Sequence, residues 1–240
     1  LAAASERPDL PWTFRVLDDP AVNAFALPGG FIYVTRGILA HMTSEAQLVG
    51  VLGHEIGHVT ARHGVDRMSR ARLAQLGLGI GMVLSETVRD LGDVLQTGTG
   101  LLFLKFSRDD EREADRLGVR YMTRLGYEPV ELARVMGMLG RASELSSPGR
   151  VPGWLSTHPE PEDRFASITA MVGDEAEPGA RRVERDGFIR RLDSLVFGPD
   201  PRQGFVDGGW FRHPELAFRV STEGGSVINE RERVRFVAAD

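Results

Sequence analysis

The chain has 240 residues, of which 42% are hydrophobic and 26% are charged, the balance of a folded globular protein with one large domain or a domain and an appendage. Its formal net charge of -5 provides no general attraction for nucleic acid, so we expect no nucleic-acid partner. The absence of cysteine excludes disulfides and Cys-ligated metals, which leaves His and carboxylate side chains as metal ligands.

Two stretches bear on localisation. The most apolar one, LGLGIGMVL at 76–84, is half the roughly 18 residues that a membrane span requires, so we expect no transmembrane segment. The opening LAAASERPDL has neither an initiator Met nor a signal-peptide pattern, as expected of a sequence from which a signal peptide has been removed or trimmed.

The first predicted element is a β-hairpin within residues 22–39. Two apolar runs flank Pro28-Gly29-Gly30, and the second run alternates between its two faces in the manner of a strand. A helix is predicted next, with Ser44 and Gln47 as a capping box at its start and Gly64 as the glycine that ends it.

Further helices are predicted downstream. Residues 71–104 have a helical pattern weakened by several glycines, which indicates a mobile or closely packed segment. Clear helices follow at 107–126, with acidic residues in the first turn, and at 129–142, where a proline begins the helix. The mixture predicts an α+β fold dominated by helices around a small sheet.

The charged, apolar-poor residues 173–187 are the predicted linker between a domain at 1–172 and a small C-terminal α/β region at 188–240. In that region we expect a short amphipathic helix from Phe188 to Val196, followed by strands at 216–220 and 233–238. The chain ends in a predicted strand, which is consistent with truncation.

The strongest chemical signal is the HExxH pattern formed by His54, Glu55 and His58. Residues four apart share a helix face, so the two imidazoles can bind one metal ion. Glu55 lies beside that ion and can accept a proton from water. Two solvated histidines on an ordinary surface helix are the alternative, and a third ligand decides between them.

Two places for the third ligand are known. An extended HExxHxxGxxH helix fails because the chain has Ala61 and Gly64 where Gly and His are required, and His63 is then interpreted as a surface or capping residue. The other place is a downstream helix, where Glu111 supplies the ligand and Asp115 holds the second ring nitrogen of a ligand histidine. An acidic helix start with its charges in water is the alternative for this pair.

Two neutral histidines and one carboxylate favour zinc with one open position, although another divalent ion fits the same ligands. Such an ion activates water for peptide hydrolysis, with Glu55 as the general base. An oxyanion donor is also needed, and His158 is a candidate, with Arg164 projecting from the next helix. A structural role is the alternative for His158.

Four stretches, taken in order over residues 10–172, resemble one family: the gluzincin zinc metallopeptidases that include the CAAX prenyl protease, HtpX and BepA. They are NAFALPGGFIYVTRGIL, EAQLVGVLGHEIGHVTARH, FSRDDEREADRLGVRYM and WLSTHPEPEDR. The resemblance implies a mainly helical, zincin-like metalloprotease domain. It also implies zinc bound by His54, His58 and Glu111, catalysis by Glu55, and Asp115 supporting a ligand histidine.

The resemblance also bears on His158 and on the hairpin. In similar periplasmic members a histidine at this position lies close to the metal, so His158 is expected to be catalytic or inhibitory. The hairpin resembles the family's active-site edge strand, onto which an extended peptide adds as a further strand; a plain structural hairpin is the alternative. The candidate substrate-binding residues are Asn23, Ala24, Phe25, Ala26, Gly29 and Gly30.

Because the chain lacks the transmembrane helices of the prenyl protease and HtpX, it resembles the soluble periplasmic branch. We therefore expect a zinc endopeptidase of the bacterial periplasm or cell envelope that acts on misfolded or misassembled envelope proteins. Expected partners are unfolded polypeptides and, through peripheral association, the membrane or the outer-membrane assembly machinery. The alternative is a chaperone-like or scaffold protein whose zinc site is closed by His158. His213 in the C-terminal region is interpreted as structural.

Overall fold

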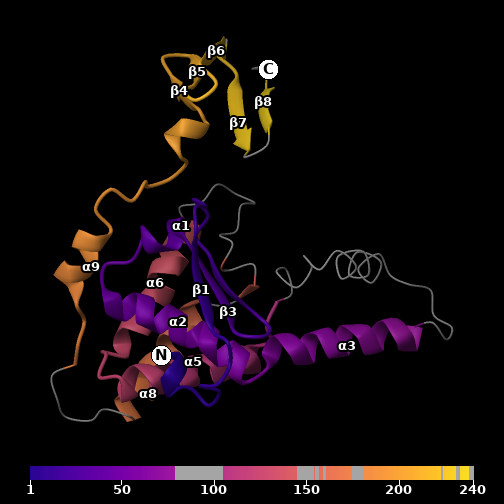
Figure 1. Cartoon of the computed structure of the whole chain (residues 1–240), viewed down its shortest axis with the longest axis vertical. Coiled ribbons are helices and arrows are strands. Elements are labelled where there is room, and N and C mark those ends of the chain that lie inside the picture. Colours follow the sequence, from indigo (N-terminus) through magenta and orange to yellow (C-terminus); the bar gives the residue numbers. More distant parts are fainter. Residues whose placement is uncertain are drawn as a thin grey trace. The chain divides into compact units, whose positions relative to one another are not determined.

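The computed structural model describes residues 1–78, 105–144, 154, 157–158, 161–174, 181–222, 224–230 and 233–237. The chain forms two compact units, Leu1–Ser194 and Leu195–Asp240. The first unit combines helices with a three-stranded sheet, and the described elements of the second unit are mainly strands (Figure 1). The predicted α+β class is confirmed.

The sheet of the first unit contains β1 (Thr13–Leu17), β2 (Ala24–Leu27) and β3 (Phe31–Thr35), in the order β1-β3-β2. β1 is parallel to β3, and β2 is antiparallel to it, so the predicted hairpin is confirmed. Its turn holds Gly29 at a φ of 97° and Gly30 at 95°, a conformation that glycine adopts without strain. β2 is an edge strand of this sheet.

The long helix after the sheet is α2 (Glu45–Thr60), preceded by the short α1 (Arg36–Leu39). Ser44 caps α2, as predicted, by accepting a hydrogen bond from the backbone N–H of Gln47. The Gln47 side chain accepts from the N–H of Thr43, one residue before the position that a capping box requires.

The end of α2 differs from the prediction. The helix stops at Thr60, and Arg62 adopts the left-handed conformation, with a φ of 62°, in the place expected of Gly64. Gly64 instead lies inside the next helix, α3 (His63–Leu78). The predicted helical pattern at 71–104 is therefore helical up to residue 78; residues 79–104 lie outside the described residues.

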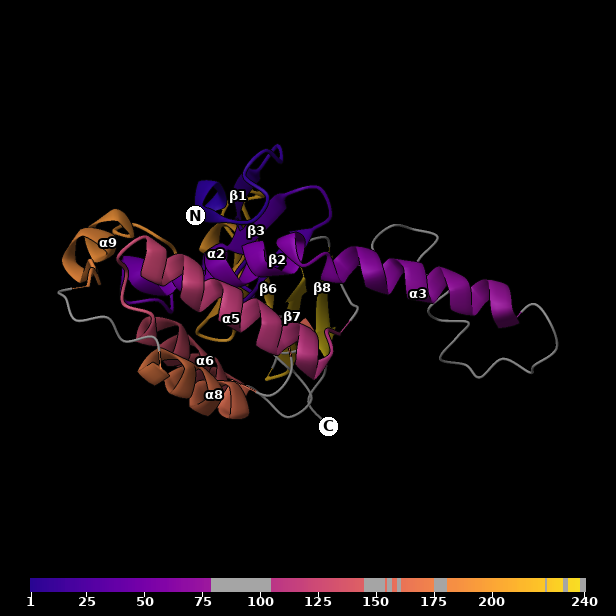
Figure 2. The ribbon, with the colours of Figure 1, turned by 90° about the horizontal axis from the view of Figure 1, so that it is seen from below.

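Three further helices complete the helical part of the first unit. They are α5 (Arg108–Arg124), α6 (Val130–Glu144) and α8 (Pro161–Asp174). A full capping box of Ser107 and Asp110 begins α5. Figure 2 shows the sheet and the α6–α8 pair on opposite sides of α2 and α5. Within the described part of the chain, no helix is long and apolar enough to span a bilayer.

α2 and α5 touch through residues that have little or no side chain. A Cβ added at Gly57 would lie 3.0 Å from the Ala114 carbonyl oxygen, and one at Gly118 would lie 3.2 Å from the His54 backbone nitrogen. Glycine at these positions lets the two backbones approach closely. The side chains that flank the contact are therefore brought to a short separation.

The helix α9 (Arg185–Arg191) ends before Val196, where the prediction ended it, and Ser194 adopts a positive φ of 72°. The preceding residues join the first unit, since Val183 and Glu184 accept backbone hydrogen bonds from the start of α2. Contacts thus divide the chain after Ser194, and the limits at 172 and 187 stay predictions.

The second unit contains the 3-10 turn η3 (Pro201–Gln203) and two small sheets, which surround the buried ring of Phe211. The strands of the first sheet are β4 (Phe205–Asp207), β5 (Trp210–His213) and β6 (Phe218–Ser221), and those of the second are β7 (Ser226–Glu230) and β8 (Arg233–Val237). The strands predicted at 216–220 and 233–238 correspond to β6 and β8.

Candidate active site

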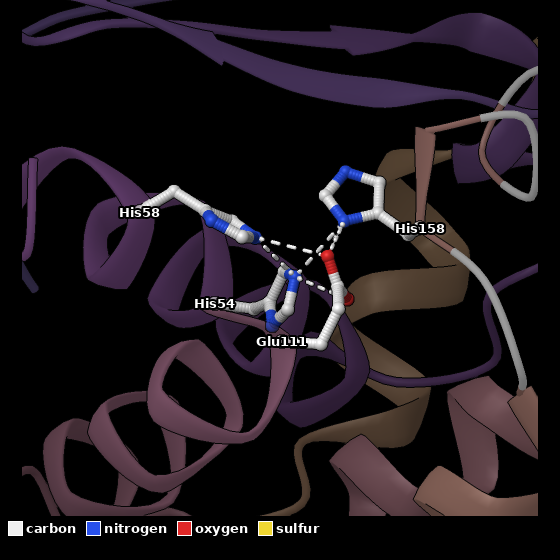
Figure 3. A group of neighbouring side chains, drawn as sticks. All are labelled: His54, His58, Glu111 and His158. Carbon is white, nitrogen blue, oxygen red and sulfur yellow. Dashed lines mark hydrogen bonds and ion pairs between the residues drawn. The ribbon is translucent and has the colours of Figure 1, made fainter. Parts of the chain in front are cut away.

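Three imidazoles and one carboxylate converge inside the first unit (Figure 3). His54 and His58 come from α2, Glu111 from α5, and His158 from the chain shortly before α8, and none is more than 2% exposed. The Nε2 atoms of His54 and His58 are 3.0 Å apart. His158 Nδ1 lies 3.3 Å from His54 Nε2 and 2.8 Å from Glu111 Oε1.

One potential ligand atom from each of these four residues lies within 4.8 Å of the others. Two of the four, His54 and His58, are a pair one helical turn apart, as the sequence pattern requires. Nitrogen and carboxylate donors at this separation are the ligands that zinc takes in proteins. The donor set therefore fits a divalent metal ion.

Asp115 lies where the sequence places it, on the α5 face that also carries Glu111. Its Oδ1 is 2.9 Å from His54 Nδ1, so the ring nitrogen that faces away from the cluster is bound by a carboxylate. This contact fixes the His54 ring with Nε2 directed at the cluster. It also favours the tautomer in which Nδ1 carries the proton and Nε2 is free to bind a metal.

Arg164, on α8, binds both carboxylates of α5. Its Nε donates to Asp115 Oδ2 at 2.8 Å, and its Nη1 lies 2.7 Å from Glu111 Oε2. Burial alone would raise the pKa of Asp115, but the charge and hydrogen bonds of Arg164, together with the contact to His54, outweigh burial and hold that pKa below its ordinary value. Because Arg164 already binds two buried carboxylates, it positions the residues of the cluster and is not free to donate to an oxyanion.

Glu55 is fully buried, and within the described residues neither of its carboxylate oxygens has a hydrogen-bond partner. Its Oε1 lies 3.6 Å from His158 Nε2. Burial raises the pKa of Glu55, although the positive charges of neighbouring side chains oppose the shift. A buried carboxylate without donors is costly, so a water or an ion that completes the cluster is the natural partner of Glu55.

His63 corrects the sequence interpretation. It is only 5% exposed, and its Nδ1 lies 2.9 Å from Nδ1 of His58, so it is neither a surface nor a capping residue. In an uninterrupted helix, five residues turn the chain by about 140° away from His58. The break at Arg62 redirects the chain and returns His63 to the His58 ring.

The contact between His58 and His63 has a defined direction when His58 binds a metal through Nε2. Its Nδ1 then carries a proton and donates it to Nδ1 of His63, whose Nε2–H faces Glu113 Oε2 at 3.4 Å. Burial lowers the pKa of His58 well below its usual value, and the neighbouring imidazoles add to this effect. The ring is therefore held in the neutral form that ligates metals.

Two aromatic residues that the sequence did not reveal enclose the cluster. Phe106 stacks on His58 with ring centroids 3.8 Å apart, and Trp154 stacks on His158 at 4.2 Å. The backbone N–H of Phe106 also donates to the Thr157 carbonyl at 3.0 Å. These residues lie far from the HExxH pattern in sequence, and no local signal links them to it.

The candidate substrate strand is β2, which has no strand paired to its other edge within the described residues. Thr35 donates its N–H to the Asn23 carbonyl, and in an antiparallel ladder the polar backbone groups alternate between the two edges. The N–H and C=O groups of Ala24 and Ala26 therefore face the open edge. Asn23 Oδ1 is buried there without a partner in the described part.

The remaining candidates of the hairpin differ in placement. The Ala24 side chain is fully buried, so only its backbone can meet a peptide. Phe25 is half-buried and stacks on Tyr33. Gly29 and Gly30 form the turn, and a Cβ on Gly30 would touch Trp12 at 3.4 Å.

Comparisons with known proteins agree with this geometry. The chain matches mitochondrial metalloendopeptidase OMA1 of Arabidopsis thaliana with 35% identity over 196 residues, which cover 78% of this chain and 38% of that protein. It matches the putative beta-barrel assembly-enhancing protease of Vibrio cholerae with 31% identity over 173 residues, which cover 69% of this chain and 35% of that protein.

A third relative is the beta-barrel assembly-enhancing protease of Escherichia coli K12, with 32% identity over 195 residues that cover 77% of this chain and 39% of that protein. The chain thus spans less than half the length of these relatives. Residues 1–172 match the model of peptidase family M48, which confirms the family inferred from the four motifs. The chain belongs to peptidase family M48.

Proposed function

We propose that this chain is a zinc endopeptidase whose ion is held by His54, His58 and Glu111. The observation that carries the proposal is the buried group of ligand atoms within 4.8 Å of one another, beside a Glu55 carboxylate that has no partner among the described residues. A general base must lie next to the reacting water and be free of other donors, and Glu55 meets both conditions. Family membership supports the metalloprotease class.

The residues of the chain divide the work of peptide hydrolysis. When bound, zinc acts as a Lewis acid that polarises the peptide carbonyl and lowers the pKa of water. Glu55 accepts the proton of the attacking water and delivers it to the leaving amine. Its burial raises its pKa toward the range in which it can both take and release a proton. Asp115 and His63 keep the imidazole rings in place.

The substrate is an extended or unfolded polypeptide that adds to the open edge of β2. The backbone groups of Ala24 and Ala26 form the pairing, and Asn23 provides a buried acceptor. An added strand places its peptide bonds between this edge and α2. Glu55 and the metal ligands of α2 would then face a backbone carbonyl of the peptide.

His158 is proposed to regulate this site. Its Nδ1 lies within hydrogen-bond distance of Glu111 Oε1 and close to His54 Nε2, so it can serve as a fourth ligand that closes the coordination sphere. This geometry favours a closed form over a standing oxyanion donor. A chaperone-like or scaffold protein with a permanently closed zinc site is the alternative that the His158→Ala variant tests.

We further propose that the protein belongs to the bacterial envelope and removes misfolded or misassembled envelope proteins. The support is the likeness to two proteins named as beta-barrel assembly-enhancing proteases. By the same argument its partners are unfolded polypeptides and the outer-membrane assembly machinery, with peripheral association to the membrane. A deletion strain that clears misassembled outer-membrane proteins as fast as its parent would contradict this role.

The activity is tested by cleavage of a reduced, unfolded model protein with the zinc-loaded chain. We expect Glu55→Gln to lower the rate at least about 100-fold while zinc content, measured by elemental analysis, stays unchanged. Glu215→Gln, an exposed residue of the second unit, is the matched control and should retain the rate. Cleavage that survives both Glu55→Gln and a chelator would refute the proposal.

The role of His158 is tested in the same assay. If His158 closes the site, His158→Ala should raise the rate and leave an open coordination position detectable by X-ray absorption. A rate that falls with unchanged zinc content would instead make His158 a catalytic residue. An inert parent together with an inert His158→Ala form would show that closure by His158 does not explain the lack of activity.

A further inference from the structure

A small hollow, partly open to solvent, lies beside His58. Its walls come from the end of β2, the end of α2 and the start of α3, which lie close together in Figure 2. The apolar part of the wall contains Leu27, Pro28, Val59 and Phe106. The hollow therefore connects the open strand edge to a proposed zinc ligand.

Two arginines, Arg7 and Arg62, line the same hollow, and its lining contains no Asp or Glu. Among the described residues neither side chain forms an ion pair or a hydrogen bond. By contrast, Arg164 and Arg36 are each paired with a carboxylate. An apolar hollow with two unpaired cations matches a carboxylate carried on an aliphatic stem.

The backbone of Arg62 is an independent sign that this side chain has a role. Arg62 has a φ of 62°, a conformation that is strained for any residue with a Cβ and that helix ends usually give to glycine. Strain of this kind persists where the surrounding structure imposes it, and it clusters at functional sites. Here the strained residue lines the hollow, four residues after the proposed ligand His58.

We propose that this hollow is a specificity pocket for a substrate carboxylate held next to the scissile peptide bond by Arg7 and Arg62. The carboxylate comes from a Glu side chain or from the C-terminus of the peptide, and the apolar wall receives the stem. This rests on the proposed function, because a peptide added to β2 passes between Ala26 and His58, both of which line the pocket. The family match does not specify such a preference.

The test measures binding rather than cleavage, so that it does not depend on turnover. Zinc-loaded Glu55→Gln protein is titrated with fluorescein-labelled peptides in an alanine-rich background, in which one Glu or one Gln is moved along the sequence. At one position we expect Glu to bind about 10- to 100-fold more tightly than Gln. Peptides that end at this position with a free or an amidated C-terminus distinguish the two sources of the carboxylate.

Three variants in the Glu55→Gln background sharpen the result. Arg62→Gly should reduce the Glu preference to within about twofold, and Arg7→Gln should reduce it substantially. Arg62→Gly should not lower the thermal midpoint, because glycine adopts the positive φ without strain, so lost preference cannot be attributed to unfolding. Arg190→Gln, an exposed arginine on α9, should retain the preference.

The proposal would be contradicted if Glu and Gln peptides bound with equal affinity at every position and if free and amidated C-termini also bound equally. A preference that survives both Arg62→Gly and Arg7→Gln would contradict it as well. If the parent chain cleaves nothing while the Glu preference is observed, the proposed endopeptidase function fails and the carboxylate pocket stands.

Discussion

The histidines of the site depend on partners that bind the nitrogen facing away from the cluster. Asp115 does this for His54, and His63 does it for His58. The first partner follows from sequence, because Glu111 and Asp115 are spaced to share one helix face. The second does not, because it requires the helix to break at Arg62.

Removing His63 should weaken metal binding without removing a ligand. We expect His63→Ala to lower zinc affinity about 10- to 100-fold, since the His58 ring loses the acceptor of its Nδ1 proton. His63→Asn, which offers an oxygen acceptor near Nδ1, should restore part of the loss. Competition with a chromophoric chelator measures the affinity. His213→Ala in the second unit is the control, and an effect of equal size there would contradict this role.

Arg164 should be required for stability as well as for the shape of the site. Arg164→Met leaves the carboxylates of Glu111 and Asp115 buried beside each other without their cation, at a cost of about 3–5 kcal/mol. Urea unfolding of the metal-free chain measures it. Arg120→Gln breaks an ion pair with Glu6 that is about 40% exposed, and it should cost no more than about 1 kcal/mol.

Among the elements, α2 and α5 determine the site because their backbones approach through glycine. The sequence predicts where both helices begin, since Ser44 and Ser107 are clear caps. It also predicts that each presents its ligands on one face. It does not predict the distance between the two helices, which depends on what Gly57 and Gly118 meet in the folded chain.

A methyl group at Gly57 should separate these helices. We expect Gly57→Ala to destabilise the chain by about 1–3 kcal/mol and to weaken zinc binding, because α5 moves away together with Glu111. Gly187→Ala on α9 meets nothing within 4 Å, so it should be neutral or stabilise by up to about 1 kcal/mol. Thermal unfolding and zinc titration of the two variants provide the comparison. If Gly57→Ala changes neither the stability nor the zinc affinity, the backbones of α2 and α5 have room for a methyl group.

The boundaries and walls of the site were less predictable than its ligands. Ligand residues follow a fixed spacing, whereas Phe106 reaches His58 through tertiary packing, and Trp154 stacks on His158 from one turn earlier in a segment that tertiary packing brings to the cluster. The end of α2 was misplaced for a related reason. Glycine is the residue type that most often ends a helix, which favoured Gly64, but tertiary packing places the left-handed residue at Arg62.

At the scale of the whole molecule, every residue of the metal cluster belongs to the first compact unit. The four come from three separate parts of the chain, so the complete set of ligands forms only when the helices have packed. Metal binding and folding of this unit are therefore coupled.

Chelation should lower the stability of the first unit. With free zinc at 100 times its dissociation constant, binding adds about 2.7 kcal/mol. For a unit of this size, that corresponds to a shift of roughly 5–11 °C in the thermal midpoint. Scanning calorimetry with and without a chelator tests the shift. A variant that lacks both His54 and His58 should show no shift, and a shift that persists in it would place the metal elsewhere.

The short segment that carries His158 is attached at two points. The N–H of Trp154 donates to the Val22 carbonyl just before β2, and the Thr157 carbonyl accepts from Phe106 just before α5. If His158 closes the site as proposed, a backbone movement that withdraws it would break both hydrogen bonds, so opening would require release at the residue before β2 and at the residue before α5 together.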